Sequence, residues 1–185
     1  MGYAQVVRRV IHISSPVFLI YYFLPEEIAG VPKRFGVILV MILTLWLDGI
    51  RILKGWVIPG ARPYEKHRIS SASWAGLGMM VAFLYFPEEY VVPVLFGMAW
   101  IDPMMGEIRK RTDVNPVVIA IPVYMVLFVS IYSFFSISWN TLLFGVIASL
   151  SACTIEHYGP LWLDDDFSMV FIPLLVLDLV RRLPL

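Results

Sequence analysis

Residues 35–53 read FGVILVMILTLWLDGIRIL, and this stretch decides the fold class. Its only charged side chains are Asp48 and Arg51. Its length is close to the roughly 20 apolar residues with which an α-helix crosses the hydrocarbon core of a bilayer. Since it also exceeds the usual length of a buried strand, we expect a transmembrane helix.

The same pattern recurs along the chain. The chain is 59% hydrophobic, with a mean hydropathy of +0.80, whereas a soluble domain is roughly 45–50% apolar. Further apolar segments cover residues 10–24, 70–86, 90–105, 116–135, 138–155 and 167–180. The sequence therefore predicts an all-α, multi-pass transmembrane helical bundle that forms one domain over residues 1–185. Seven helices are expected; six is the alternative, since several segments are short.

Composition also excludes several classes of site. Lys and Arg number 14, as do Asp and Glu, so the neutral chain has no overall attraction for nucleic acid. The single cysteine, Cys153, excludes an intrachain disulfide and a multi-cysteine metal site. Arg8 and Arg9 precede an apolar run as in a signal peptide. No small-residue cleavage site follows them, so we interpret the run as the first membrane helix.

Basic residues predict the orientation, because short loops rich in Lys and Arg stay in the cytoplasm. With the N-terminus inside, most of the basic residues fall on the cytoplasmic side: Arg8, Arg9, Arg51, Lys54, Arg62, Lys66, Arg68, Arg109, Lys110 and Arg111. Lys33 and Arg34 lie outside and are offset by Glu26 and Glu27. Two basic residues disagree with this orientation, since seven spans place Arg181 and Arg182 outside.

Acids gather on the same predicted cytoplasmic face. Three adjacent carboxylates, Asp164–Asp166, follow Glu156 in the sixth connection. Orientation rules explain cations on this face but do not explain acids. Carboxylates bind hard divalent cations, and Lys or Arg neutralises phosphate oxygens. The pattern favours a site for a nucleotide and Mg²⁺. Adjacent aspartates project in different directions, so we expect two to reach the ion and one to face water or cap a helix.

The first predicted helix carries Arg8, Arg9 and His12, whose spacing places all three on one face. They are candidates for two phosphate contacts and a polar partner. The alternative is a positively charged anchor with an incidental histidine. In the second predicted helix, Asp48 and Arg51 are three residues apart. Charged groups inside a membrane are costly, so this pair either serves a polar site or is satisfied within itself.

Asp102 ends the fourth apolar segment and is followed by Gly106 and by Arg109–Arg111. A carboxylate close to three cations suits Mg²⁺ with polyphosphate, and Gly106 allows a close approach of ligand to backbone. The alternative is an interfacial acid paired with neighbouring bases. Glu65 follows Pro63 in a loop that is solvated by default, and Ser70 or Ser71 is a candidate helix cap. Gly76 and Gly78 favour close helix packing. No Walker lysine loop, GxGxxG or Ser/His/Asp constellation is present.

Taken in order, these motifs resemble the dolichol kinase family, which includes phytol kinases and the CTP-dependent diacylglycerol kinase. The matching segments are Arg8-Arg9-Val-Ile-His12, Asp48-Gly-Ile-Arg51, Glu65 with Ile69-Ser-Ser-Ala-Ser, Ile101-Asp102-Pro103-Met104-Met105, and Glu156 with Asp164–Asp166 and Pro173. The chain departs from the family at Ile101 and Arg109, where the family has glycine, and it lacks the family's Lys-x-x-Glu-Gly segment.

The resemblance implies a CTP- and Mg²⁺-dependent lipid kinase acting at the cytoplasmic face. Its substrate would be a membrane alcohol of the dolichol or polyprenol type, or diacylglycerol. The implied roles are Mg²⁺ binding by Asp102 and Asp164–Asp166, phosphate binding by Arg8, Arg9, Arg51, Arg109, Lys110 and Arg111, proton acceptance by Glu156 or His12, and support by Asp48, Glu65 and Gly106.

Two other functions stay open: a cytidylyltransferase that forms a CDP-lipid, and a non-catalytic or transport protein with the same fold. The expected partners are a membrane lipid and a nucleotide, with no nucleic acid. A homo-oligomer is also open.

Overall fold

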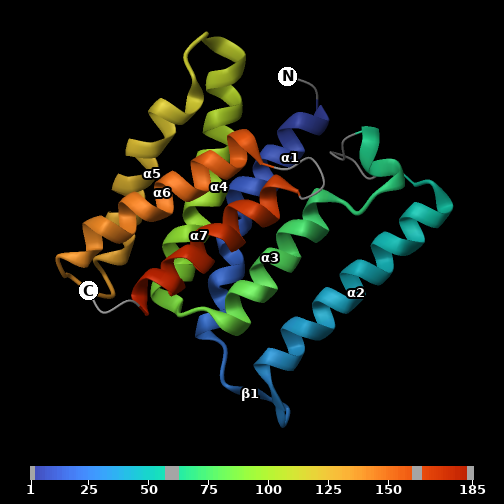
Figure 1. The fold of residues 1–185 in the computed structure, drawn as a ribbon. Coiled ribbons are helices and arrows are strands. Elements are labelled where there is room, and N and C mark those ends of the chain that lie inside the picture. The colour runs from blue at the N-terminus through green and yellow to red at the C-terminus, as the bar shows by residue number, and fades with distance from the viewer. Residues whose placement is uncertain (1–2, 57–62, 160–163, 183–185) are drawn as a thin grey trace.

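The structure, a computed structural model, describes residues 3–56, 63–159 and 164–182 (Figure 1). Of the residues described, 82% are helical. Arg62, which the sequence places on the cytoplasmic side, and residues 161–163 before the three aspartates lie outside the described residues.

The described residues form seven α-helices, which confirms the predicted number of helices. The helices are α1 (Tyr3–Ser14), α2 (Lys33–Lys54), α3 (Ser71–Tyr85), α4 (Glu88–Arg111), α5 (Pro116–Tyr132), α6 (Asn140–Tyr158) and α7 (Asp165–Arg181). Two 3₁₀ helices, η1 (Ser15–Phe23) and η2 (Pro63–His67), lie in the N-terminal half. Among the residues that the structure describes, the one departure from an all-α fold is a short antiparallel hairpin of β1 (Glu27–Ile28) and β2 (Val31–Pro32).

The first predicted segment changes helix type at Ser15, where α1 continues as η1. Pro16 lies at the start of η1 and has no N–H to donate into the preceding turn. A 3₁₀ helix rises about 2.0 Å per residue, against 1.5 Å in an α-helix. The combined element therefore reaches roughly 36 Å, more than the roughly 30 Å of a hydrocarbon core.

Four helical segments in the described chain are long and apolar enough to cross a membrane: Val6–Phe23, Lys33–Lys54, Glu88–Arg111 and Asn140–Tyr158. Ser71–Tyr85 and Pro116–Tyr132 are shorter apolar helices. Pro116 and Asn115 define the start of α5, because Asn115 accepts a hydrogen bond from the backbone N–H of Val117.

Helix α4 lies at the centre of the bundle and packs against α1, η1, α3, α5 and α7. Its buried side chains include Val94, Leu95 and Met98. Aromatic rings fill the end of the core away from the N-terminus, where Tyr90 stacks on Tyr132 at 5.7 Å and Phe144 meets both rings edge-on. Because α4 contacts so many elements, it fixes their relative positions.

Helix α2 has the opposite burial pattern. It stands at the edge of the molecule beside α3 (Figure 1), and its only buried residues are Met41, Asp48 and Arg51. Large apolar side chains on the same helix are exposed, including Val40 at 63% and Trp46 at 62%. The charged pair therefore lies inside and the apolar surface outside, which is the reverse of a helix in water.

We predict that Gly97→Ala destabilises the bundle by about 1–3 kcal/mol. A Cβ at Gly97 would overlap a ring carbon of the fully buried Tyr124, so the ring or its helix must shift. The measurement is the free energy of unfolding in detergent. Gly36→Ala in α2 is the control, since no described atom lies within 4 Å of its Cβ. Equal stability of the two variants would contradict this packing account.

Candidate functional site

The ends of α1, α4, α6 and α7 enclose a polar cavity of about 260 Å³, called here the acid–base cavity. Its walls carry most of the residues that the sequence selected. They are Arg8, Arg9, His12, Asp102, Pro103, Gly106, Arg109, Lys110, Glu156 and Asp165. Residues from the first and the last thirds of the chain therefore meet at one place, at the end of the bundle near the N-terminus (Figure 1).

His12 lies between Asp102, which lines this cavity, and Asp166, which is buried beside it. Its Nε2 lies 3.3 Å from Asp102 Oδ2 and its Nδ1 lies 3.5 Å from Asp166 Oδ1. Nε2 is also 3.1 Å from the carbonyl oxygen of Met98, which can only accept a hydrogen bond. Nε2 therefore carries a proton, and Nδ1 is the nitrogen turned toward Asp166.

The three adjacent aspartates have different environments. Asp164 is the N-cap residue of α7, because its Oδ1 accepts a hydrogen bond from the backbone N–H of Asp166 at 3.1 Å. Asp165 lines the acid–base cavity. Asp166 points into the bundle, where its side chain is 5% exposed. Its Oδ1 makes no hydrogen bond to any described residue. The sequence predicted that one of the three would cap the helix or face water, and Asp164 caps it.

Burial raises the pKa of the Asp166 carboxyl well above its usual range. The negative charges of Asp102, Asp165 and Asp164 raise this pKa further, and Arg8 lowers it. Without a cation, the ionised form of Asp166 is therefore disfavoured. A buried acid surrounded by like charges is the arrangement that a bound cation would relieve.

Three arginines at this end of the bundle pair with one of two glutamates, Glu156 or Glu107. Arg109 Nη2 donates to both carboxylate oxygens of Glu156, at 2.8 and 3.1 Å. Arg9 Nη2 donates to Glu107 at 2.6 Å, and Arg111 pairs with the same carboxylate. Arg111 is mostly exposed and does not line the cavity, so the expected cluster of three cations contributes only Arg109 and Lys110. Glu107 was not among the predicted residues, although its spacing of four from Arg111 is the helical pairing signal.

Asp48, Arg51 and Glu65 belong to a separate α2–α3 polar cluster. Arg51 donates to Asp48 and to the backbone carbonyls of Glu65 and Arg68, at 2.8 and 2.6 Å for the carbonyls. Asp48 Oδ2 accepts hydrogen bonds from the Ser70 backbone N–H at 2.7 Å and from the Ser73 hydroxyl at 3.0 Å.

These hydrogen bonds connect the segment before α3 to α2. The structure therefore places Arg51 in helix packing and not among the cavity residues. The cluster contacts the aspartates through one side chain, since Ser71 Oγ lies 3.1 Å from Glu65 Oε1 and 3.4 Å from Asp164 Oδ2.

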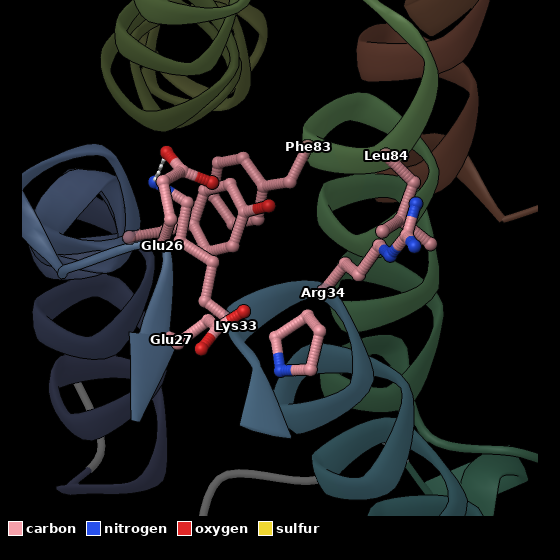
Figure 2. Close-up of a pocket in the computed structure, with 8 residues that line it drawn as sticks. Glu26, Glu27, Lys33, Arg34, Phe83 and Leu84 are labelled. Carbon is pink, nitrogen blue, oxygen red and sulfur yellow. Dashed lines mark ion pairs between the residues drawn. The ribbon is translucent and has the colours of Figure 1, made fainter. Parts of the chain in front are cut away.

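A larger cavity of about 350 Å³ lies at the opposite end, between η1, α2 and α3. Lys33 pairs with Glu26 at 3.0 Å (Figure 2). The Lys33 ammonium also lies 4.9 Å from the ring centroid of Tyr21, which stacks on Phe83 at 4.8 Å. Glu26 is solvent-exposed. Lys33 and Glu26 already neutralise each other here, and none of the described residues lining this cavity belongs to a group that could hold a metal ion.

Two groups of side chains at or beside the acid–base cavity could hold a metal ion. His12, Asp102 and Asp166 each offer a ligand atom within 4.8 Å of the others, and so do Asp164, Asp165 and Asp166. A Cβ at Gly106 would meet no described atom within 4 Å, so open space adjoins this cavity-lining backbone. The volume is below the roughly 300–1,000 Å³ of whole-ligand pockets. A whole nucleotide would therefore not fit inside this cavity.

Comparisons with protein-family models, with curated proteins and with solved structures gave no match to this chain.

We predict that Asp166→Asn raises the melting temperature of the cation-free protein at pH 7. An unfolded aspartate titrates near 3.9, and the folded carboxyl has the higher pKa. The contribution of the Asp166 carboxyl to the free energy of unfolding is therefore full below about pH 4. It is lost as the pH rises toward the pKa of this carboxyl in the folded protein. The rise in melting temperature caused by Asp166→Asn should be smallest at pH 4 and should grow toward neutral pH. Each kcal/mol gained in the free energy of unfolding corresponds to a rise of about 2–4 °C.

The measurement is thermal unfolding in detergent with a chelator present. Asp178→Asn is the matched control, because Asp178 lies on the same helix and pairs with Arg181 and Arg182 at the far end. A variant that is less stable than the wild type at pH 7 would overturn this account of Asp166.

Proposed function

We propose that the protein is a multi-pass membrane enzyme of the dolichol kinase type. It transfers the γ-phosphoryl group of CTP to the hydroxyl of a membrane alcohol at the cytoplasmic face. The lipid is an isoprenoid alcohol of the dolichol or polyprenol type, or diacylglycerol. The observation that carries the proposal is the meeting of acids and bases from α1, α4, α6 and α7 in one cavity.

The membrane location is supported by the burial pattern of α2 and η1. Apolar side chains such as Val40, Trp46 and Phe23 are exposed, whereas Asp48 and Arg51 are buried. In water this arrangement leaves apolar area unburied and removes charge from solvent, and both effects are unfavourable. In lipid both effects become favourable, because the apolar side chains contact acyl chains and the protein shields the charged pair from the hydrocarbon. All helices then cross the bilayer in alternating directions.

Two basic residues remain exceptions to the proposed orientation. Arg181 and Arg182 lie at the C-terminal end of α7, on the outer side in this arrangement. Asp178 lies 3.5 Å from Arg181 and 2.7 Å from Arg182, so both arginines pair with one carboxylate.

In the proposed reaction, the alcohol oxygen forms a bond to the γ-phosphorus of CTP. The bond from that phosphorus to the bridging oxygen breaks, and CDP leaves with the electron pair. The alcohol proton passes to Glu156 or His12. Arg8, Arg9, Arg109 and Lys110 line the cavity and hold the phosphate oxygens. Asp102, Asp165 and Asp166 would hold Mg²⁺, which supplies charge neutralisation when bound.

We expect a cysteine at position 66 to be labelled only from the cytoplasmic side and one at position 88 only from outside. Lys66 and Glu88 are exposed, so Lys66→Cys and Glu88→Cys accept reagent without unfolding. Both are made in a Cys153→Ala background, because Cys153 is the single natural thiol. The readout is labelling of vesicles of known orientation by an impermeant maleimide. The reverse pattern would place the acid–base cavity outside, away from CTP.

Among the acids, Asp102→Asn and Asp166→Asn should lower CTP-dependent phosphorylation of a polyprenol or of diacylglycerol by about 100-fold or more. Asp164→Asn should have the mildest effect, because Asn caps a helix as well as Asp does and its amide oxygen can still bind a cation. The assay follows transfer of labelled γ-phosphate into lipid extracts, with Asp178→Asn as the control.

Each alternative function has its own outcome in this assay. Release of pyrophosphate with formation of a CDP-lipid would show a cytidylyltransferase. No consumption of nucleotide with either alcohol would support a non-catalytic protein. Equal tolerance of all three substitutions at 102, 164 and 166 would reject the proposed site.

A further inference from the structure

The two groups of potential cation ligands share one residue, Asp166. The first group joins it to His12 and Asp102, and the second joins it to Asp164 and Asp165. Asp166 is also the buried member, with an Oδ1 that makes no hydrogen bond to a described residue. A buried carboxylate between two sets of ligands has the position of a bridging ligand.

We propose that the acid–base cavity binds two divalent cations and that Asp166 is the ligand common to both. This inference rests on the proposed function for its site and goes beyond it in the number of ions and in their ligands. One cation lies with His12 and Asp102, and the other lies with Asp165 and Asp164. His12 is then a ligand, which leaves Glu156 as the proton acceptor.

The orientation of His12 supports the first cation position. A histidine that binds a metal through one nitrogen usually donates its other N–H to a carbonyl or carboxylate. His12 Nε2 has such an acceptor in the Met98 carbonyl oxygen at 3.1 Å. Its Nδ1 lies 3.5 Å from Asp166 Oδ1. Two ligands of one cation are about 3.0–4.2 Å apart for bonds of about 2.1 Å, so this gap holds an ion without rearrangement.

Charge supports two ions instead of one. Asp102, Asp164, Asp165 and Asp166 carry four negative charges when ionised, which two divalent cations balance. The ligand atoms in each group lie within 4.8 Å of one another, so closing them around an ion requires a shift of less than about 1 Å. The first group contains an imidazole nitrogen and the second only oxygens. Mn²⁺ accepts both sets of ligands and is therefore the appropriate probe.

The test counts Mn²⁺ ions and detects their coupling in the full-length protein in detergent. Equilibrium dialysis gives the number bound, and electron paramagnetic resonance shows whether two ions share a bridging ligand. We expect two ions and a spin-coupled signal in the wild type. Asp166→Asn should abolish the coupling and weaken both sites by on the order of tenfold or more. His12→Gln and Asp165→Asn should each leave one ion, and Asp178→Asn should leave two.

Several results would overturn the proposal: one ion or none in the wild type, two uncoupled ions, or a coupled pair that survives Asp166→Asn. His12→Gln and Asp165→Asn keep the test decisive if Asp166→Asn fails to fold. The outcome is separable from the proposed function. Two coupled ions without phosphoryl transfer from CTP would reject the kinase activity alone, and kinase activity with a single ion would reject the two-cation centre alone.

Discussion

The contact of His12 with Asp102 and Asp166 is the constraint on which the rest of the site depends. It joins α1, α4 and α7 through one imidazole ring, at 3.3 and 3.5 Å. The contact brings like-charged acids close together, and burial removes the water that would screen their repulsion. Neighbouring pairs such as Arg109 with Glu156 complete the walls. Like-charged carboxylates therefore lie close together at one end of a well-packed bundle.

Packing around α4 offsets the repulsion between these acids. The face of α4 below Asp102 is buried against several helices, and Gly97 allows Tyr124 to lie directly on its backbone. On the site's other flank, the α2–α3 polar cluster satisfies Asp48 and Arg51 within the protein. Rigid surroundings hold charged groups at distances that they would not adopt alone. A site built this way is pre-organised for a ligand of the opposite charge.

Hydropathy alone predicted the number and the approximate limits of the helices, because each apolar run is long and is separated from the next by polar or proline-containing turns. Local spacing also placed Arg8, Arg9 and His12 on one face, and all three line the cavity. Spacing failed where partners are distant in sequence. The family resemblance implied phosphate binding by Arg51, whereas the backbone carbonyls of Glu65 and Arg68 accept hydrogen bonds from its guanidinium. Spacing also selected Gly76 and Gly78 for packing but not Gly97, whose close neighbour Tyr124 lies on another helix.

The most direct test of the central claim is the binding of CTP to the protein in lipid nanodiscs, measured by calorimetry with and without Mg²⁺. The cavity carries acids and bases together, so the account predicts that CTP binds with Mg²⁺ and binds at least tenfold more weakly, by about 1.4 kcal/mol or more, without it. Replacing both Arg8 and Lys110 by Gln should weaken binding even with Mg²⁺ present. Binding of equal strength with and without Mg²⁺, or no binding in either condition, would contradict the account.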